Sequence, residues 1–130
     1  MKNEAKERPM SPFMIGPYYK PQLTSVLSIT NRLTGIFLTI ISMPLLLWWV
    51  LALMSGPEAF SFVSAFLAGI YGQALVLISL YSLCYHLMNG IRHLIWDTAQ
   101  MLELEQVYQS GWLMLAASAV LFMLTLWISL

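Results

Sequence analysis

The side chains best suited to chemistry gather in one short stretch of the sequence: His86, Asn89, Arg92, His93 and Asp97. An α-helix turns about 100° per residue, so Gly90, His93 and Asp97 would all lie within about 40° of the first histidine. The sequence around them is strongly apolar, and polar groups in such a helix rarely face lipid. We therefore expect this helix face to meet protein, a cofactor or a path for water.

His86 would lie about two turns, or ~10 Å, deeper in the membrane than His93. One role for a neutral imidazole there is to ligate a haem iron, with Gly90 letting the flat macrocycle approach the backbone. The other is a hydrogen bond to a neighbouring helix, with Gly90 as a small packing contact. The chain has only two histidines, and both would approach from the same side of one helix. A six-coordinate haem would therefore take its other ligand from a different polypeptide.

A second polar group lies near residue 30, where Ser28 and Arg32 are four residues apart and Asn31 stands beside them. Residues at this spacing share one face of a helix. A hydroxyl and a guanidinium together suit a quinone carbonyl, whose oxygen gains negative charge as it is reduced. The alternative is a serine that caps the helix and an arginine that extends to lipid phosphates. Both explanations fit the residues.

The elements that must position these residues follow from composition. The 130 residues are 59% hydrophobic and 9% charged, whereas average proteins have about 25% charged residues. The stretches without charge cover 33–57, 59–91 and 106–130, and each exceeds the ~20 helical residues that cross a bilayer. The sequence thus predicts an all-α integral membrane protein and excludes a soluble domain. Its three transmembrane helices are expected over about 24–54, 66–96 and 110–130.

The N-terminal part has its own signals. Four prolines within residues 1–23 argue against a continuous helix, so this segment is expected to be extended and to lie on the membrane surface or on a partner. Thr24 or Ser25 is the expected N-terminal cap of the first helix. Pro44 lies inside that helix and is expected to kink it.

The connections between the spans are less sharply marked. A turn is expected at 55–58, where Gly56 and Pro57 are adjacent, and the second helix is expected to begin anywhere within 60–72. Acidic residues in 97–109 indicate a solvated connection before the third span.

Basic residues set the expected orientation. There are six of them: Lys2, Lys6, Arg8, Lys20, Arg32 and Arg92. The first four precede the first span, the fifth lies at its start and the sixth closes the second span. The loop around 54–70 has no basic residue. Because basic residues favour the cytoplasmic side, the N-terminus and the 97–109 connection are expected there. We therefore predict a multi-pass protein of the inner (cytoplasmic) membrane, with its C-terminus on the periplasmic side.

Three segments together resemble the cytochrome b subunit of succinate dehydrogenase, the larger of that complex's two membrane anchors. They are Arg-Pro-Met-Ser-Pro at 8–12, Ser-Ile-Thr-Asn-Arg-Leu-Thr-Gly at 28–35, and His-Leu-Met-Asn-Gly-Ile-Arg-His-Leu-Ile-Trp-Asp at 86–97. They occur in the family's order, and the three predicted spans cover the rest of the chain. The segment at 86–97 is the most specific of the three.

The resemblance implies a haem b site. His86 would be an axial ligand of the haem iron, with Asn31, Arg92 and His93 near the haem propionates. A second small membrane anchor would supply the other ligand and complete a helical bundle with this chain. Family members commonly have histidine where this chain has Asn31, and an amide still donates a hydrogen bond but brings no charge.

The resemblance also implies a quinone site and further partners. Ser28 and Arg32 would line the ubiquinone site. From their expected position near the cytoplasmic interface, Asp97 and His93 are predicted to relay protons to the reduced quinone. An FAD-containing flavoprotein and an iron–sulfur protein would dock on the cytoplasmic face. The lipid bilayer would surround the spans, and no nucleic acid is expected as a partner.

The predicted function is a membrane anchor of succinate dehydrogenase that binds haem b and quinone. It would pass electrons from succinate oxidation to ubiquinone without itself binding succinate, and no catalytic residue is assigned to it. One alternative is the anchor of a quinol:fumarate reductase, which needs the same sites. The other is a haem-free membrane assembly or channel subunit, in which His86 serves helix packing alone.

Overall fold

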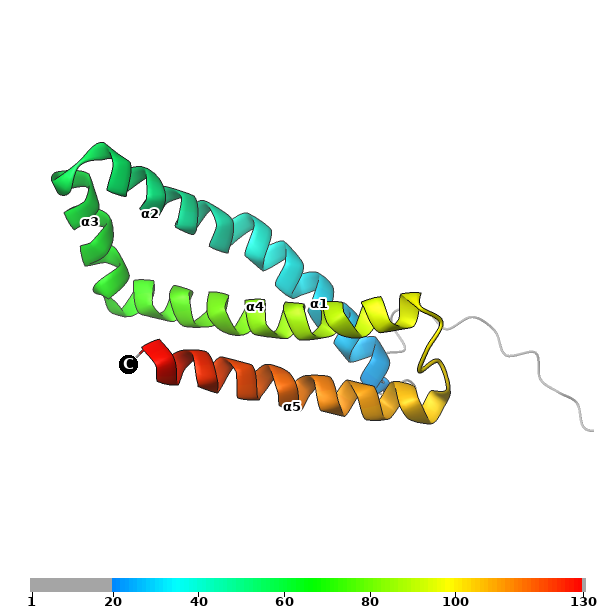
Figure 1. The fold of residues 1–130 in the computed structure, drawn as a ribbon. Coiled ribbons are helices and arrows are strands. Elements are labelled where there is room, and N and C mark those ends of the chain that lie inside the picture. The colour runs from blue at the N-terminus through cyan, green and yellow to red at the C-terminus, as the bar shows by residue number, and fades with distance from the viewer. Residues whose placement is uncertain (1–19, 130) are drawn as a thin grey trace, which may run out of the picture.

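The computed structural model describes residues 20–129, which form helices and contain no strand. Three helical stretches are long and apolar enough to cross a membrane: Leu23–Ser55, Ile70–Asp97 and Leu104–Ser129. Figure 1 shows them as three long rods, the first of which is joined to the second by a short helix. The predicted all-α fold with three spans is confirmed. The segment at 8–12 lies outside the described residues.

The first span begins earlier than the expected caps. Helix α1 covers Leu23–Phe37, and Gln22 before it has extended backbone and makes no side-chain cap bond. Thr24 and Ser25 therefore lie inside the first turn, and the cap predicted at one of them is wrong. Pro21 stands directly before Gln22, so the helix begins as soon as the backbone is past the last proline of the N-terminal segment.

A π-helical segment, η2 (Leu38–Ser42), interrupts the first span, and α2 (Met43–Ser55) follows with Pro44 in its first turn. Proline has no N–H, and its ring clashes with the carbonyl four residues earlier, so a regular α-helix does not pass through it without adjustment. The wider π-helical turn absorbs this misfit. The irregularity expected at Pro44 is thus present as a change of helix type just before it.

Helix α3 (Pro57–Ala68) is a short apolar helix that the sequence did not distinguish from the second span. Gly56 before it has φ +116°, a conformation that glycine adopts far more readily than other residues. Aromatic rings hold α3 against α2, with centroids 5.5 to 6.3 Å apart: Trp48–Phe62, Trp48–Phe66 and Trp49–Phe60. Extended backbone at Gly69 then ends α3, and α4 (Ile70–Asp97) begins.

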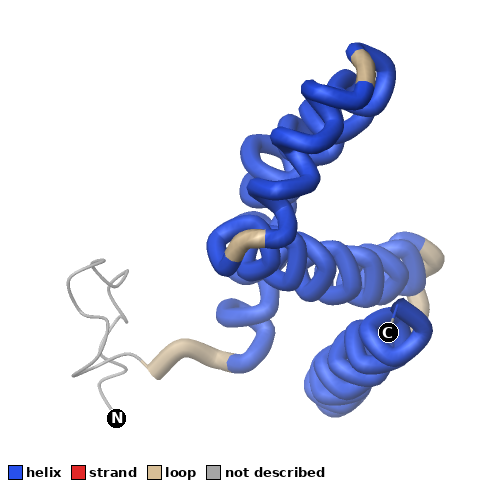
Figure 2. The backbone as a smooth tube through the Cα atoms, turned by 90° about the vertical axis from the view of Figure 1, so that its left-hand side faces the viewer, coloured by secondary structure: helices blue, strands red, loops and turns tan. Residues whose placement is uncertain are grey.

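Helix α4 packs against both of the other spans, α1 and α5 (Leu104–Ser129), and these two also contact each other. The α2–α3 pair points away from α5 (Figure 2). The buried core is small and is centred on one residue from each of these three helices, Leu27, Tyr85 and Met114. Most large apolar side chains outside it are exposed, which suits a lipid environment and packing against other membrane subunits.

The connection between α4 and α5 is shorter than the expected solvated segment at 97–109. Only 98–103 are non-helical, and α5 already begins at Leu104. Of the three acidic residues in 97–109, Asp97 ends α4, Glu103 lies in the connection and Glu105 lies in the first turn of α5, where Gln109 Nε2 donates to Glu105 Oε1 at 3.0 Å. Charged residues mark where a span leaves the bilayer, and the helix itself continues past that level.

Candidate functional site

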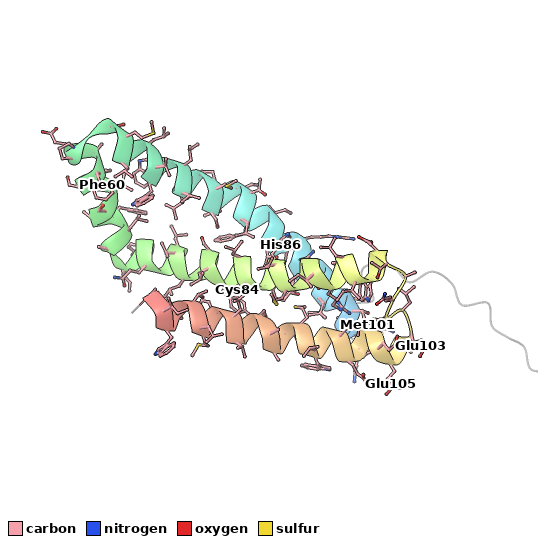
Figure 3. The ribbon with its side chains drawn as sticks, viewed as in Figure 1. Phe60, Cys84, His86, Met101, Glu103 and Glu105 are labelled. Carbon is pink, nitrogen blue, oxygen red and sulfur yellow. The ribbon has the colours of Figure 1, made fainter. Side chains whose placement is uncertain are left out.

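His86 lies on the side of α4 that faces α1 (Figure 3), and its Nδ1 atom meets two oxygens there. The backbone carbonyl oxygen of Asn31 is 3.2 Å away, and Thr34 Oγ1 is 3.3 Å away. Because a carbonyl oxygen only accepts hydrogen bonds, Nδ1 must carry the proton. A neutral His86 therefore has its free lone pair on Nε2, the form of imidazole that ligates a metal.

The backbone of α1 approaches the His86 ring closely at Gly35. A Cβ atom at this position would lie 3.0 Å from His86 Cε1, closer than ordinary contact. The ring is thus confined by Asn31 and Thr34 at Nδ1 and by Gly35 along the neighbouring edge. A glycine at this point of α1 is what allows the imidazole to sit between the two helices.

An open apolar groove of about 520 Å³ lies beside His86, between α4 and the first span. Its lining comes from both sides and includes Gly35, Leu38, Ser42, Leu46, Leu83 and His86. Leu38 and Ser42 are the two ends of the π-helical segment. On α4 itself, a Cβ at Gly90 would have nothing within 4 Å. The residues present fit a flat apolar ligand: His86 with Nε2 not engaged by Asn31 or Thr34, the apolar wall of the groove, and open space at Gly90 outside the groove lining.

The other residues of the predicted His86 face continue toward the end of α4. His93 is half-buried, and its ring packs edge-on against Trp96, with centroids 5.1 Å apart. Asp97 is exposed at the last position of the helix. The Oδ1 atom of Asn31 is buried and has no hydrogen-bond partner among residues 20–129. The structure therefore brings Asn31 to His86, and places His93 and Asp97 progressively nearer to the helix end.

Arg92 does not lie with these residues. It is 6% exposed, and it donates from Nε to Ser110 Oγ at 3.0 Å and from Nη2 to the Val107 carbonyl at 2.8 Å. Its guanidinium carbon also lies 4.1 Å from the centre of the Trp96 ring. Arg92 thus joins α4 to α5 on a side that His86 does not share, and its place near haem propionates stays a prediction.

Ser28 and Arg32 lie one turn apart on α1, as predicted. Ser28 is half-buried and Arg32 is exposed. Within the described part of the chain, neither side chain makes a hydrogen bond or ion pair. Their donors are therefore available to a ligand or to a partner subunit at the end of α1 that lies nearest the end of α4.

Several residues that shape the site were not singled out from the sequence. Thr34 and Gly35 hold the His86 ring, and Tyr85 donates its hydroxyl proton to the Leu27 carbonyl at 3.1 Å. Asn89, which the sequence marked as polar without a role, has no exposed surface, and neither of its amide atoms has a partner among the described residues. The spacing of Tyr85, Asn89 and Arg92 places them on a second face of α4, and that spacing was the available signal.

Comparison with known proteins places the chain in a class. The family described as "Succinate dehydrogenase/Fumarate reductase transmembrane subunit" matches residues 4–125, and the chain belongs to this family. It is 38% identical over 123 residues to the succinate dehydrogenase cytochrome b560 subunit of Marchantia polymorpha, covering 92% of this chain and 88% of that protein. The three membrane-length helices agree with a transmembrane subunit.

Bacterial relatives carry closely related names. The chain is 38% identical over 122 residues to the succinate dehydrogenase cytochrome b556 subunit of Rickettsia prowazekii, covering 94% of this chain and 92% of that protein. It is 35% identical over 119 residues to the protein of the same name from Paracoccus denitrificans, covering 92% and 89%. The resemblance to succinate dehydrogenase cytochrome b subunits that the sequence indicated is confirmed.

Proposed function

We propose that this chain is the membrane anchor of a succinate dehydrogenase, with His86 as an axial ligand of a haem b. The observation that carries the proposal is the Nδ1–H of His86 held by the Asn31 carbonyl at 3.2 Å, which leaves Nε2 free to bind iron. When bound, the haem supplies reversible one-electron transfer. The apolar lining of the groove beside His86 would suit the flat face of a haem, and the names of the cytochrome b relatives support the same proposal.

The other residues near this site have supporting roles in the proposal. Asn31 and His93 would lie near the haem propionates, where an amide and an imidazole N–H donate hydrogen bonds. The Nε and Nη2 donors of Arg92 already serve Ser110 and Val107, so we give Arg92 chiefly the task of fixing α5 against α4. Breaking that contact would loosen the helix that presents His86.

Ser28 and Arg32 are the proposed quinone-binding residues. A hydroxyl and a guanidinium one turn apart, both without partners within residues 20–129, can donate to a quinone oxygen as electrons arrive and its negative charge grows. His93 and Asp97 lie on one face near the end of α4. In the proposal they pass protons from the cytoplasmic side to the reduced quinone.

The proposal requires partner subunits. The second haem ligand would come from a second small membrane anchor, and a flavoprotein with FAD and an iron–sulfur protein would deliver electrons from succinate. Large apolar side chains such as Leu33 (60% exposed) and Ile40 (63% exposed) are spread over the first span. This surface supports a chain whose spans are covered by lipid and by another anchor.

The spectrum of the purified complex tests the haem proposal. A reduced-minus-oxidised difference spectrum should contain a b-type band, because a haem-free subunit would have none. The complex should be isolated through a tag on the flavoprotein, so that the band is assigned to the whole assembly. Absence of the band from an assembled complex would leave His86 with helix packing alone.

The reverse reaction is the second candidate function, because the family description names fumarate reductase beside succinate dehydrogenase. The relatives named above are succinate dehydrogenase subunits, which favours succinate oxidation. Preference for a high-potential quinone in the purified complex would support succinate oxidation. Preference for a low-potential quinone would support fumarate reduction.

The orientation proposed for the chain gives a prediction of its own. Reporter fusions after Leu130 should be active on the periplasmic side, and fusions within 98–103 on the cytoplasmic side. The reason is that all six basic residues lie toward one side of the three spans and none lies between the first two. Reporter activity of the opposite kind at both positions would place the N-terminus outside and reject the proposed orientation.

A further inference from the structure

The hydroxyl of Thr34 takes part in a closed triangle of hydrogen bonds with His86. Thr34 Oγ1 donates to the Asn31 carbonyl at 2.9 Å. The same two oxygens lie 3.3 Å and 3.2 Å from Nδ1 of His86. Neither Thr34 nor its hydroxyl belongs to the ligand or quinone residues discussed above, so its contact with the histidine needs a separate explanation.

The direction of each bond in the triangle follows from the donors available. The carbonyl of Asn31 cannot donate, so the Nδ1 proton points toward it, and the single hydroxyl proton of Thr34 also goes to that carbonyl. The lone pairs of Thr34 Oγ1 then face the Nδ1–H as a second acceptor. If Thr34 instead donated to an unprotonated Nδ1, that nitrogen's lone pair would face the carbonyl oxygen at 3.2 Å, an unfavourable arrangement.

We propose that Thr34 is a positioning residue for His86, which fixes the rotation of the imidazole and increases the electron donation of Nε2 toward a bound iron. A hydrogen bond accepted from the distal N–H of a metal-bound histidine orients the ring and raises the basicity of the ligating nitrogen. This inference rests on the proposed haem function. It adds a residue that sets the haem's reduction potential without touching the metal.

The surroundings of the ring make this role specific to Thr34. A Cβ at Gly35 would meet His86 Cε1 at 3.0 Å, so the ring already lies against the backbone of α1. Its second edge is therefore fixed by van der Waals contact, and the hydrogen bonds at Nδ1 set the remaining rotation. Thr34 itself is anchored by its bond to the helix carbonyl one turn earlier, which restricts its rotamer.

The test is a redox titration of the haem in the assembled complex with Thr34→Val, which keeps the side-chain shape and removes the hydroxyl. The iron should stay low-spin with the haem content little changed, because the Asn31 carbonyl still accepts from Nδ1. Weaker donation by Nε2 should favour the reduced iron. We expect the ratio of reduced to oxidised haem at a fixed solution potential to rise at least threefold, about 28 mV at 59 mV per tenfold.

Two further variants separate positioning from simple disturbance of a membrane helix. Thr34→Ser keeps the hydroxyl, so its potential should stay near that of the unaltered complex. Thr125 lies on α5, and its hydroxyl likewise donates to a carbonyl of its own helix, that of Leu121 at 3.0 Å. Thr125→Val removes this hydroxyl and should not change the reduction potential of the haem.

The outcomes that contradict the role of Thr34 differ from those that contradict the haem proposal. A shift in Thr34→Val no larger than in Thr125→Val, or an equal shift in Thr34→Ser, would overturn the role of Thr34 while leaving the haem proposal intact. Absence of any b-type haem from the unaltered complex would overturn the proposed function itself. The two failures are therefore distinguished in a single set of preparations.

Discussion

A complex with His86→Ala is expected to lose its b-type absorbance, with haem content falling to about a tenth of normal or less, the scale of one lost strong ligand contact. The reason is that the chain offers no replacement. Its only other histidine, His93, lies seven residues away, which is about 10 Å along the helix. The measurement is haem per assembled complex, taken from the reduced-minus-oxidised spectrum and the amount of flavin.

His93→Ala is the matched control for this prediction, since it removes the same kind of side chain from the same helix. It should leave the iron ligated and low-spin, and it should shift only the reduction potential. A complex that kept its low-spin haem signature without His86 and lost it without His93 would reverse the assignment of the ligand. The flavin content of the membranes shows whether both variants assemble, so that haem content is compared at equal amounts of complex.

The three spans were predictable because their signal is one of composition. The chain has 9% charged residues, and its uncharged stretches are longer than a helix needs to cross a bilayer. Such stretches predict transmembrane helices. The ends of the spans were less predictable. The helix α5 begins at Leu104 among acidic residues, because charge tells where a helix meets water and not where its backbone stops being helical.

The arm of α2 and α3 shows what composition does not contain. The sequence placed a turn around Gly56 correctly but left the start of the second span open, because residues 57–68 are as apolar as a span. The structure separates them through extended backbone at Gly69 and through packing of Trp48 and Trp49 on α3. The aromatic packing depends on contacts between α2 and α3 across the turn, and short apolar segments do not reveal such contacts.

The candidate site divides in the same way. Helical periodicity placed His86, Gly90 and His93 on one face, and the structure agrees. The same periodicity puts Arg92 about 120° from His86, on the side where it bonds Ser110, so its separation from the histidine was already present in the sequence. The contacts of Thr34 and Gly35 with His86 could not be predicted from the sequence, because they depend on the axial position of α1 relative to α4.

The quinone site gives the second prediction with a large effect. Arg32→Lys and Ser28→Ala should each lower quinone reductase activity about tenfold or more, the ~1.4 kcal/mol scale of one lost charge-assisted contact. Arg32→Lys keeps the charge but loses the planar fork of donors. Ser28→Ala removes a hydroxyl, and the alanine that replaces it favours the helix. The measurement is quinone reduction with succinate as electron donor, in membranes with equal amounts of complex.

The control is succinate oxidation with an artificial dye that accepts electrons upstream of the quinone, and this activity should stay near normal in both variants. Ser55→Ala is a matched helix variant, because among residues 20–129 the Ser55 hydroxyl bonds its own helix alone, at the Leu51 carbonyl 2.7 Å away, near the opposite end of the first span. Its ratio of quinone to dye activity should not change.

If Ser28 and Arg32 were a helix residue and a headgroup anchor alone, the ratios of their variants would match that of Ser55→Ala. The quinone donors would then have to be sought on another part of the complex. A fall in the ratio confined to the two proposed residues would instead assign the rate to donors aimed at the quinone oxygen.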